Sequence, residues 1–373
     1  MSDRRESPID DDVLDGWLRL AALPMRDVAA LDTLTALPGG LGALRHQSDT
    51  ELQNAGLDER LIARLRTAAP DTTAVRRWLD GERHTLVTWR SPQYPALLTR
   101  IPDPPALLYA LGDPDLLGLP LLAVVGSRKP TRGGEETARL FCAAFCQMGL
   151  GVVSGLALGI DASAHAAALD ADGTTIAVLG TGIDRVYPAA NQALATRIAG
   201  AGCIITEFPL GSEARREHFP QRNRLISGLA LGTLVIEAAL RSGSLITARL
   251  AAEQGREVFA VPGSIRNPMA RGCHRLIRDG ARLVESVDDV IAELGVMTET
   301  LKNELTEDEF AEPRALDPAH RKLLDALGFE PCAVDEIATR TALTIAEVSS
   351  MLLILELEGR VESLPGGRYA RLQ

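Results

Sequence analysis

The chain has 373 residues, enough for two or three domains with a sizeable core. It is 46% hydrophobic and 24% charged, as an ordinary globular protein is, and no apolar run reaches the roughly 18 residues that a membrane span needs. A net charge of −11 argues against non-specific binding of nucleic acid over the whole surface.

Charge is spread unevenly along the chain. Residues 215–282 contain 12 arginines and five acidic residues, a net charge of +7, whereas residues 283–373 contain eight basic and 19 acidic residues, a net charge of −11. The planar guanidinium group of arginine suits phosphate. Arginine is also common and lysine scarce throughout this sequence. Charge alone therefore supports two interpretations equally: a phosphate-binding segment, or a surface on which arginine is simply frequent.

The five cysteines form no Cys-x-x-Cys pair, and the N-terminus is polar and acidic, unlike a secretory signal. These features predict reduced, packed thiols in a cytoplasmic protein without a membrane anchor. No histidine lies at ligand spacing from two cysteines, so we expect no zinc site.

Residues 1–82 predict a small helical domain of the SAM-like kind, with short helices joined by glycine turns. The hairpin Leu37–Leu44 is an approximate match to DNA-binding helix-hairpin-helix modules. No basic cluster lies beside it in the sequence, which favours a role in packing.

Residues 83–295 predict a Rossmann-like domain that begins with a proline-rich connector and a strand at Leu107–Leu111. From Leu121 onward, short apolar runs alternate with helical segments, which is typical of a doubly wound, mostly parallel α/β sheet. We expect strands at Leu121–Val125, Val152–Val153, Thr175–Leu179, Cys203–Thr206, Thr233–Ile236, Glu257–Val261 and Arg282–Val284. We expect helices at Thr131–Met148, Asp161–Leu169, Ala190–Ala199, Arg222–Leu229, Ser244–Glu253, Gly272–Arg278 and Val287–Leu294.

An acidic linker at residues 296–316 and a winged-helix domain at residues 317–373 are expected to follow. The third helix of that domain, Ile345–Glu358, would enter the major groove in a DNA-reading winged helix. Here it carries glutamates and an apolar middle, Met351–Ile354. The pattern therefore favours packing or protein contact over DNA reading.

The stretch Val153–His165 leads from a strand through glycine turns into a helix, which is a common way to hold an anion. Ligands of parallel sheets bind outside the carboxyl ends of the strands. Five consecutive strand-end turns of this sequence carry glycine, serine or arginine, which favours an extended anionic ligand. The candidate contacts are Gly126, Ser127, Arg128, Ser154, Gly155, Gly159, Arg185, Phe219, Arg222, Asn223, Arg224, Ser242, Gly243 and Ser244.

No catalytic constellation is evident. Ser154, Ser242 or Ser244 could be paired with His165 or His218, but no spacing fixes a triad. Asp161 and His165 lie four residues apart on one helix face, and we expect them to support the glycine turn as a hydrogen-bonded pair. There is no Walker motif and no dinucleotide fingerprint, so no cofactor is expected.

Several motifs together resemble the DprA family, also called Smf, the DNA-processing proteins of natural transformation. They are Gly126-Ser-Arg128, Ser154–Asp161 with His165, Thr175–Gly180, Tyr187-Pro188, Phe219–Ile226, Glu237 with Ser242–Ala248, and Glu257–Gly263. The resemblance is dense from about Tyr94 to Val284, and the flanking domains match in order.

The resemblance implies a Rossmann-like homodimer, not an enzyme, that binds and protects incoming single-stranded DNA and loads the RecA recombinase onto it. It also implies that Arg128, Arg222 and Arg224 line the DNA pocket, with backbone donors from Gly126 and Ser154–Gly155. Phe219 and Tyr187 are the aromatic residues nearest the predicted edge and could stack on bases.

Two other functions stay open from the sequence. One is a nucleotide-processing enzyme of the phosphoribohydrolase type, in which Glu237 would act, although the Pro-Gly-Gly-x-Gly-Thr motif of that group is absent. The other is a protein-interaction scaffold that works through the acidic tail.

Overall fold

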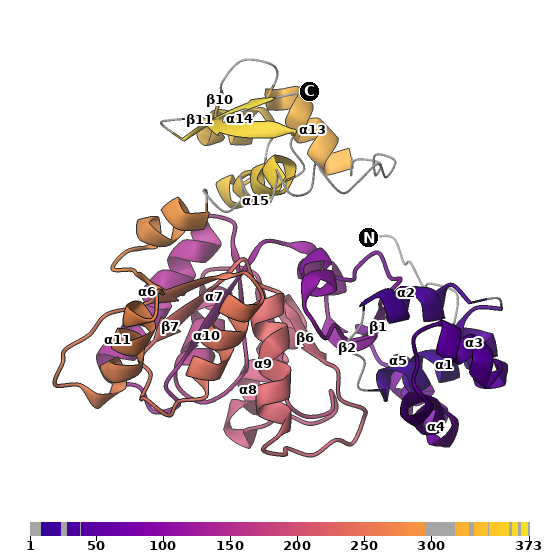
Figure 1. Ribbon diagram of the computed structural model, residues 1–373. Helices are drawn as coiled ribbons and strands as arrows, with labels where there is room; N and C mark the ends of the chain where they lie inside the picture. The colour runs from indigo at the N-terminus through magenta and orange to yellow at the C-terminus, as the bar shows by residue number, and fades with distance from the viewer. Residues whose placement is uncertain are drawn as a thin grey trace.

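A nine-stranded sheet forms the centre of the computed structural model, which describes residues 9–23, 28–37, 39–294, 318–327, 332–341, 343–357, 360–364 and 367–371 (Figure 1). The strand order is β1-β2-β6-β5-β4-β3-β7-β8-β9. The pairs from β6 to β9 are parallel, whereas β1 pairs antiparallel with β2, and β2 with β6. The strands are His84–Thr88, Leu107–Gly112, Leu121–Gly126, Gly151–Ser154, Thr175–Val178, Cys203–Thr206, Gly232–Ile236, Glu257–Ala260 and Arg282–Leu283. The expected Rossmann-like, mostly parallel α/β fold is confirmed.

Helices cover both faces of this sheet, because successive residues of a strand point to opposite sides. Leu122 and Val124 of β3 belong to one core with residues of α6 and α7, and Leu121 and Ala123 belong to a second core with residues of α9, α10 and α11. A third core joins α8 to the β2–β6–β5 side of the sheet. These helices are α6 (Arg132–Gln147), α7 (Ile160–Asp170), α8 (Gln192–Ala201), α9 (His218–Gly228), α10 (Ser244–Glu253) and α11 (Arg271–Arg278), with a further helical segment at 287–294.

The N-terminal unit has five described helices, which are α1 (Asp11–Ala21), α2 (Val28–Thr35), α3 (Asp49–Asn54), α4 (Glu59–Thr67) and α5 (Thr72–Leu79), with a 3-10 turn at Leu41–His46. Helices α1 to α4 share a small core, whereas Val75 of α5 packs in the core on the β1–β2 side of the sheet. Leu14 and Leu18 of α1 also pack with Leu86 of β1 and Tyr109 of β2, so this unit sits on the antiparallel end of the sheet.

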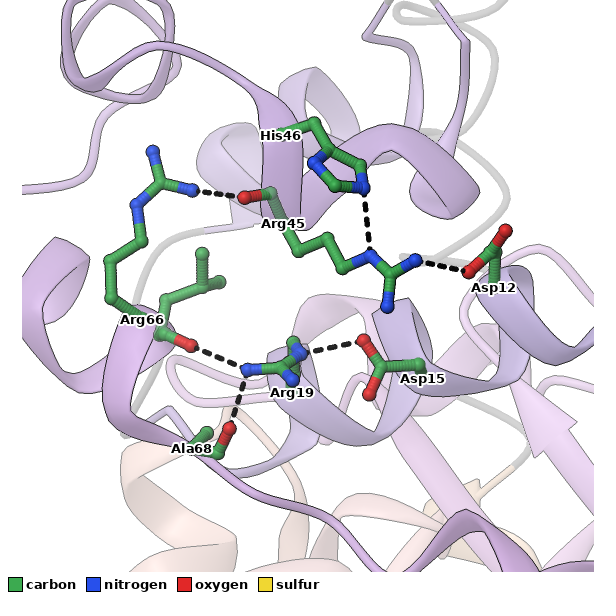
Figure 2. A network of polar contacts seen from close by, with 8 residues as sticks. Asp12, Asp15, Arg19, Arg45, His46, Arg66 and Ala68 are labelled. Atoms are coloured by element: carbon green, nitrogen blue, oxygen red, sulfur yellow. Dashed lines mark hydrogen bonds and ion pairs between the residues drawn. The ribbon is translucent and has the colours of Figure 1, made fainter.

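Arg19, Arg45 and Arg66 bind other residues within the N-terminal unit (Figure 2). Arg19 binds Asp15 at 2.6 Å and the carbonyl of Ala68, and Arg66 donates to the carbonyl of Arg45 at 2.6 Å. Arg45 in turn is 2.9 Å from Asp12. These contacts tie α1, Arg45 and α4 together. The hairpin itself packs closely on α1, since a Cβ on Gly16 would lie 2.2 Å from the carbonyl oxygen of Leu41, which agrees with a packing role.

The C-terminal unit is a winged helix, as expected. It contains α13 (Pro318–Leu327), α14 (Val334–Thr341), α15 (Ile345–Leu357) and a small sheet in the order β10-β12-β11, formed by Cys332–Ala333, Arg368–Arg371 and Val361–Leu364. The predicted acidic linker at 296–316 lies outside the described residues. Among the helices described, none alone is long and apolar enough to cross a membrane; α14 and α15 meet the length and composition test only together, bent by 108°.

Two differences from the sequence-based prediction have physical reasons. Strand β1 is not among the expected strands, because five residues at an edge carry little periodic signal and are held by pairing with β2. Helix α9 begins at His218, four residues before the predicted start at Arg222. Pro220 lies in the first turn of α9, where proline is tolerated, so the helix can begin before it.

Candidate nucleic-acid interface

The turns after five strands meet at one edge of the sheet, here called the carboxyl edge. Strands β6, β5, β4, β3 and β7 are consecutive in the sheet and parallel, so their carboxyl ends lie side by side. The chain order reverses between β4 and β7, which flank β3. In open α/β sheets such a switch point is where ligands bind.

Arg128, Phe219 and Tyr187 form a stacking row on this edge. The Arg128 guanidinium carbon lies 5.7 Å from the centre of the Phe219 ring, and the Tyr187 ring centre lies 5.7 Å from Phe219 at a tilt of 45°. Arg128 is exposed, Tyr187 is 51% exposed and Phe219 is half-buried. Gly180 makes room for Phe219, since a Cβ there would come within 3.1 Å of the ring. The stacking row thus offers aromatic faces and a cation to solvent.

Arg222 lies beneath this surface, which corrects its predicted role as a phosphate contact. Its side chain is 4% exposed, and Nη1 donates to the carbonyl of Val178 at 2.7 Å. A Cβ on Gly155 would lie 1.9 Å from that nitrogen, so the glycine is needed for the arginine to fit. Burial lowers the pKa of Arg222 to about 10, while the nearby Asp161 acts in the opposite direction.

Asp161 is a buried carboxylate that holds the glycine turn after β4. Its Oδ2 accepts hydrogen bonds from the backbone N–H groups of Gly155 at 3.2 Å and Ala157 at 3.3 Å. Burial raises the pKa of Asp161, and Arg222 is the strongest influence that opposes the rise. The N–H of Gly155, expected as a phosphate donor, is therefore already bound inside the protein.

Arg224 also faces inward, contrary to its predicted role. It forms an ion pair with Glu207, each side chain being 12% exposed, and its Nε lies 3.5 Å from Asp103. Burial raises the pKa of Glu207, and the charge of Arg224 opposes this. The arrangement links α9 to the turn after β6 and to the proline-rich connector. It therefore fixes the position of α9 at the carboxyl edge.

The expected pairing of Asp161 with His165 does not occur. His165 is fully buried and its Nδ1 lies 2.7 Å from the hydroxyl of Thr175. Since Thr175 donates its proton to the carbonyl of Val152 at 3.1 Å, it accepts from His165, and Nε2 of His165 is left buried without a partner. Burial lowers the pKa of His165 to about 3. Its role is to hold α7 against β5.

Other predicted contacts are explained by close packing. The hydroxyl of Ser154 is buried and donates to the carbonyl of Val124 at 2.6 Å. A Cβ on Gly126 would lie 1.9 Å from the carbonyl oxygen of Ile236, and one on Gly159, whose φ is +80°, would lie 2.3 Å from that of Ser127. The Ser154 side chain and the two glycines therefore allow close packing beneath the carboxyl edge.

Glu237 joins three elements at the switch point. Its φ of +52° is rare for a residue other than glycine, and such strain is kept only where the surroundings impose it. The carboxylate accepts from the backbone N–H of Thr131 at 2.7 Å, from the hydroxyl of Thr131 at 2.6 Å and from Asn267 at 3.2 Å. A cavity of about 250 Å³ adjoins it, lined by residues that include Gly133, Gly134 and Pro262.

The remaining predicted contacts lie around the carboxyl edge. The hydroxyls of Ser242 and Ser244 are 2.7 Å apart, next to the exposed Gly243 at the start of α10. Asn223 is half-buried on α9, and Ser127 is 7% exposed, with its hydroxyl accepting from the N–H of Lys129 at 3.1 Å. Arg185 is exposed and lies 3.7 Å from Glu213.

A second hollow, of about 470 Å³, lies in the loop after β6 and is lined by residues that include Phe208, Arg215 and His218. Exposed cations that were not predicted as contacts accompany this loop and the turn after β3: Lys129, Arg132, Arg215 and Arg216. Lys129 and Arg132 follow Arg128 in the sequence, and Arg215 and Arg216 begin the basic segment 215–282. Their positions could therefore have indicated all four as contacts from the sequence alone. Within the described ranges, no group of histidine, cysteine and acidic residues could hold a metal ion.

Comparison with known proteins gives consistent matches. The model of "DNA recombination-mediator protein A" matches residues 85–295, and that of the "DprA winged helix domain" matches residues 307–367. Protein Smf of Escherichia coli is 39% identical over 363 residues, which cover 96% of this chain and 95% of that protein. DNA processing protein DprA of Streptococcus pneumoniae is 48% identical over 200 residues, 54% of this chain and 71% of that protein.

Two solved structures are similar throughout most of their length. The X-ray structure of DNA processing protein A from Streptococcus pneumoniae has a TM-score of 0.64 and 35% identity, covering 77% of this chain and 99% of that one. DNA processing protein A from Helicobacter pylori, solved to describe its single-stranded DNA binding mode, has a TM-score of 0.52 and 29% identity. That match covers 56% of this chain and 95% of the other.

Proposed function

Because the chain belongs to the DprA/Smf family of DNA-processing proteins, we propose that it binds single-stranded DNA along the carboxyl edge of its sheet. In this proposal the protein is a recombination mediator in natural transformation: it protects incoming single strands and loads RecA onto them. The description of the matched family as a recombination mediator supports the proposal, as does the Helicobacter pylori relative, whose structure was solved to describe a single-stranded DNA binding mode.

The observation that carries the proposal is the stacking row of Arg128, Phe219 and Tyr187. Proteins that bind single strands combine aromatic faces, on which bases stack, with cations that follow the phosphates. Here a guanidinium group lies over a ring that is itself next to a second, exposed ring. Arginine can pair with a phosphate while it stays in contact with an aromatic face.

The phosphates of the strand would follow the exposed cations on either side of the stacking row. Arg128 and Lys129 lie after β3, Arg185 after β5, and Arg215 and Arg216 after β6. Arg222 and Arg224 have a different part: they hold the glycine turn and the start of α9 in place from inside the protein. This division explains why a basic segment can serve DNA although two of its arginines are buried.

We also propose that the protein is not an enzyme. The candidate nucleophiles are engaged elsewhere: Ser154 bonds Val124, and Ser242 and Ser244 bond each other. The candidate bases are engaged too, His165 with Thr175 and His218 with the carbonyl of Gly180 at 3.1 Å. Glu237, the residue that a phosphoribohydrolase would use, directs its carboxylate to Thr131 and Asn267. Release of free base from nucleoside monophosphates by the purified protein would contradict this part.

The partner side of the proposal is a homodimer that hands single-stranded DNA to RecA. Family membership is what supports it. Sedimentation at micromolar concentration should give twice the mass of the chain, and the protein should shorten the lag before RecA assembles on protein-coated single strands. A monomer by sedimentation would contradict the homodimer, and an unchanged lag would contradict the loading of RecA.

The DNA-binding part is tested with Arg128→Ala and a fluorescent oligothymidine. Loss of one charge-assisted bond to phosphate should weaken binding by about 1.5–3 kcal/mol, roughly 10- to 150-fold in Kd. The slope of log affinity against log salt should fall by about 0.7. Arg139→Ala is the matched control, because Arg139 is an exposed arginine of α6 that lies 4.0 Å from Glu135. If Arg128→Ala and Arg139→Ala bind alike, the proposal fails.

A further inference from the structure

Helix α15 of the winged-helix domain lies against the Rossmann-like domain. In Figure 1 it is the part of the winged-helix domain nearest to that domain, and it contacts α6. The contact is very close at Gly149, just after α6: a Cβ there would lie 2.5 Å from the carbonyl oxygen of Ala346 and 2.8 Å from the backbone nitrogen of Ser350. Only a glycine allows the two backbones to approach in this way.

Two faces of α15 have different partners. Val348, Leu352 and Leu355 are fully buried in the core of the winged-helix domain. Ala346, Ser350 and Leu353 follow the same helical spacing on the neighbouring face. Leu353 packs against the core formed by α6, α7 and the sheet, and the hydroxyl of Ser350 is buried without a hydrogen-bond partner. The apolar middle of this helix is therefore shared between two domains.

The charge of α15 does not suit DNA. Its 13 residues include two glutamates, Glu347 and Glu356, and no lysine or arginine. A helix in the major groove needs cations for the phosphates on both sides, and glutamates would be repelled by them. Small residues that face a glycine, in contrast, are what close helix packing requires.

The docking site is also remote from the carboxyl edge. Helix α6 begins just after the Arg128 turn and ends at Gln147, before β4 starts at the opposite edge of the sheet. Sixteen helical residues span about 24 Å. The winged-helix domain thus sits at the end of the sheet away from the stacking row, where it leaves that row open.

From these contacts we infer that α15 is a docking helix, and that its binding site is the C-terminal end of α6 with Gly149 in this chain's own Rossmann-like domain. Its face of Ala346, Ser350 and Leu353 recognises protein, not duplex DNA. The inference does not depend on where single-stranded DNA binds, because it concerns the other end of the sheet.

The experiment measures energy transfer between dyes on the two domains of the full chain. The five native cysteines are buried, so dyes would attach to cysteines introduced at the exposed positions Leu140 on α6 and Arg368 on β12. We expect high transfer in this labelled protein and loss of transfer with Ser350→Arg, because the long cation cannot fit against Gly149. Ala346→Arg tests the same face independently in case one variant does not fold.

Two controls separate the docking face from a general effect on α15. Ser350→Ala removes a hydroxyl that has no partner and should keep full transfer. Glu347→Arg puts the same cation on the exposed side of the helix and should keep it too. The inference is overturned if the correctly folded Ser350→Arg and Ala346→Arg variants transfer as well as Glu347→Arg. It is also overturned if duplex DNA alone abolishes transfer, since α15 would then leave this site for DNA.

Discussion

The charges of Arg128 and Arg222 both lower the pKa of Asp161, yet the two side chains have different roles. Arg128 is exposed over the Phe219 ring, whereas Arg222 is 4% exposed and bonded to a strand carbonyl. The family resemblance implied both as DNA contacts, because a sequence motif does not distinguish a buried arginine from an exposed one. Burial follows from how α9 packs on the sheet, which no local pattern encodes.

Phe219 gives a prediction that separates stacking from charge. Phe219→Ala should weaken oligothymidine binding by about 1–3 kcal/mol, the usual contribution of one stacked base. The salt slope should stay as in the unchanged protein, since no phosphate contact is lost. Phe219→Tyr keeps an aromatic face and should restore affinity. Equal binding by the alanine and tyrosine variants would mean that no base lies on this ring.

His165 gives a prediction about stability and pH. Its pKa is about 3 in the folded protein because burial disfavours the charged form, and 6.5 is its ordinary value. The unfolded chain therefore binds the extra proton first, and the folded state loses stability as pH falls from about 6.5 towards 3. At pH 5 the loss from this residue should be about 2 kcal/mol relative to pH 7.

His165→Asn tests this by urea unfolding at pH 7 and pH 5. The asparagine amide can still donate to Thr175 but does not titrate, so its stability should fall less between the two pH values than that of the unchanged protein. Other titrating groups contribute to both proteins and cancel in the comparison. An identical fall in both would show that His165 is not the responsible group.

At the scale of elements, Glu237 holds the start of α6 through Thr131, which also caps that helix with its hydroxyl at 3.1 Å from the N–H of Gly134. Thr131 is three residues from Arg128, so the same contacts position the Arg128 turn. Glu237→Ala should lower the free energy of unfolding by about 1–3 kcal/mol, the cost of leaving such donors unpaired. It should also weaken oligothymidine binding.

The control for Glu237→Ala is Glu253→Ala on α10, a glutamate in an exposed pair with Arg249. Exposed pairs contribute little to stability, so unfolding of that variant should change by less than about 1 kcal/mol. The account of Glu237 is wrong if its alanine variant unfolds at the same urea concentration as the control.

Element positions were predictable where an apolar run is continuous and bounded by turns. The predicted bounds of β6 and α10 coincide with the observed Cys203–Thr206 and Ser244–Glu253. Edge strand β1 was not predicted, because its five residues depend on pairing with β2. The close approach of Gly149 to α15 was not predictable either, since it joins residues about 200 positions apart in the chain.

At the scale of the whole molecule, the two ends of the sheet have separate tasks. The carboxyl edge presents the stacking row and the exposed cations, and the opposite edge carries the winged-helix domain on α6. The family and the fold class could be predicted from sequence motifs, whereas this division required the structure.

The central claim is that single-stranded DNA follows the carboxyl edge across the stacking row. A crystal structure of the protein with an oligothymidine of six nucleotides tests it most directly. We expect a thymine base stacked on Phe219 or Tyr187 and a phosphate oxygen within about 2.7–2.9 Å of the Arg128 guanidinium. A strand bound at the opposite edge, or on the winged-helix domain with the stacking row left free, would contradict the account.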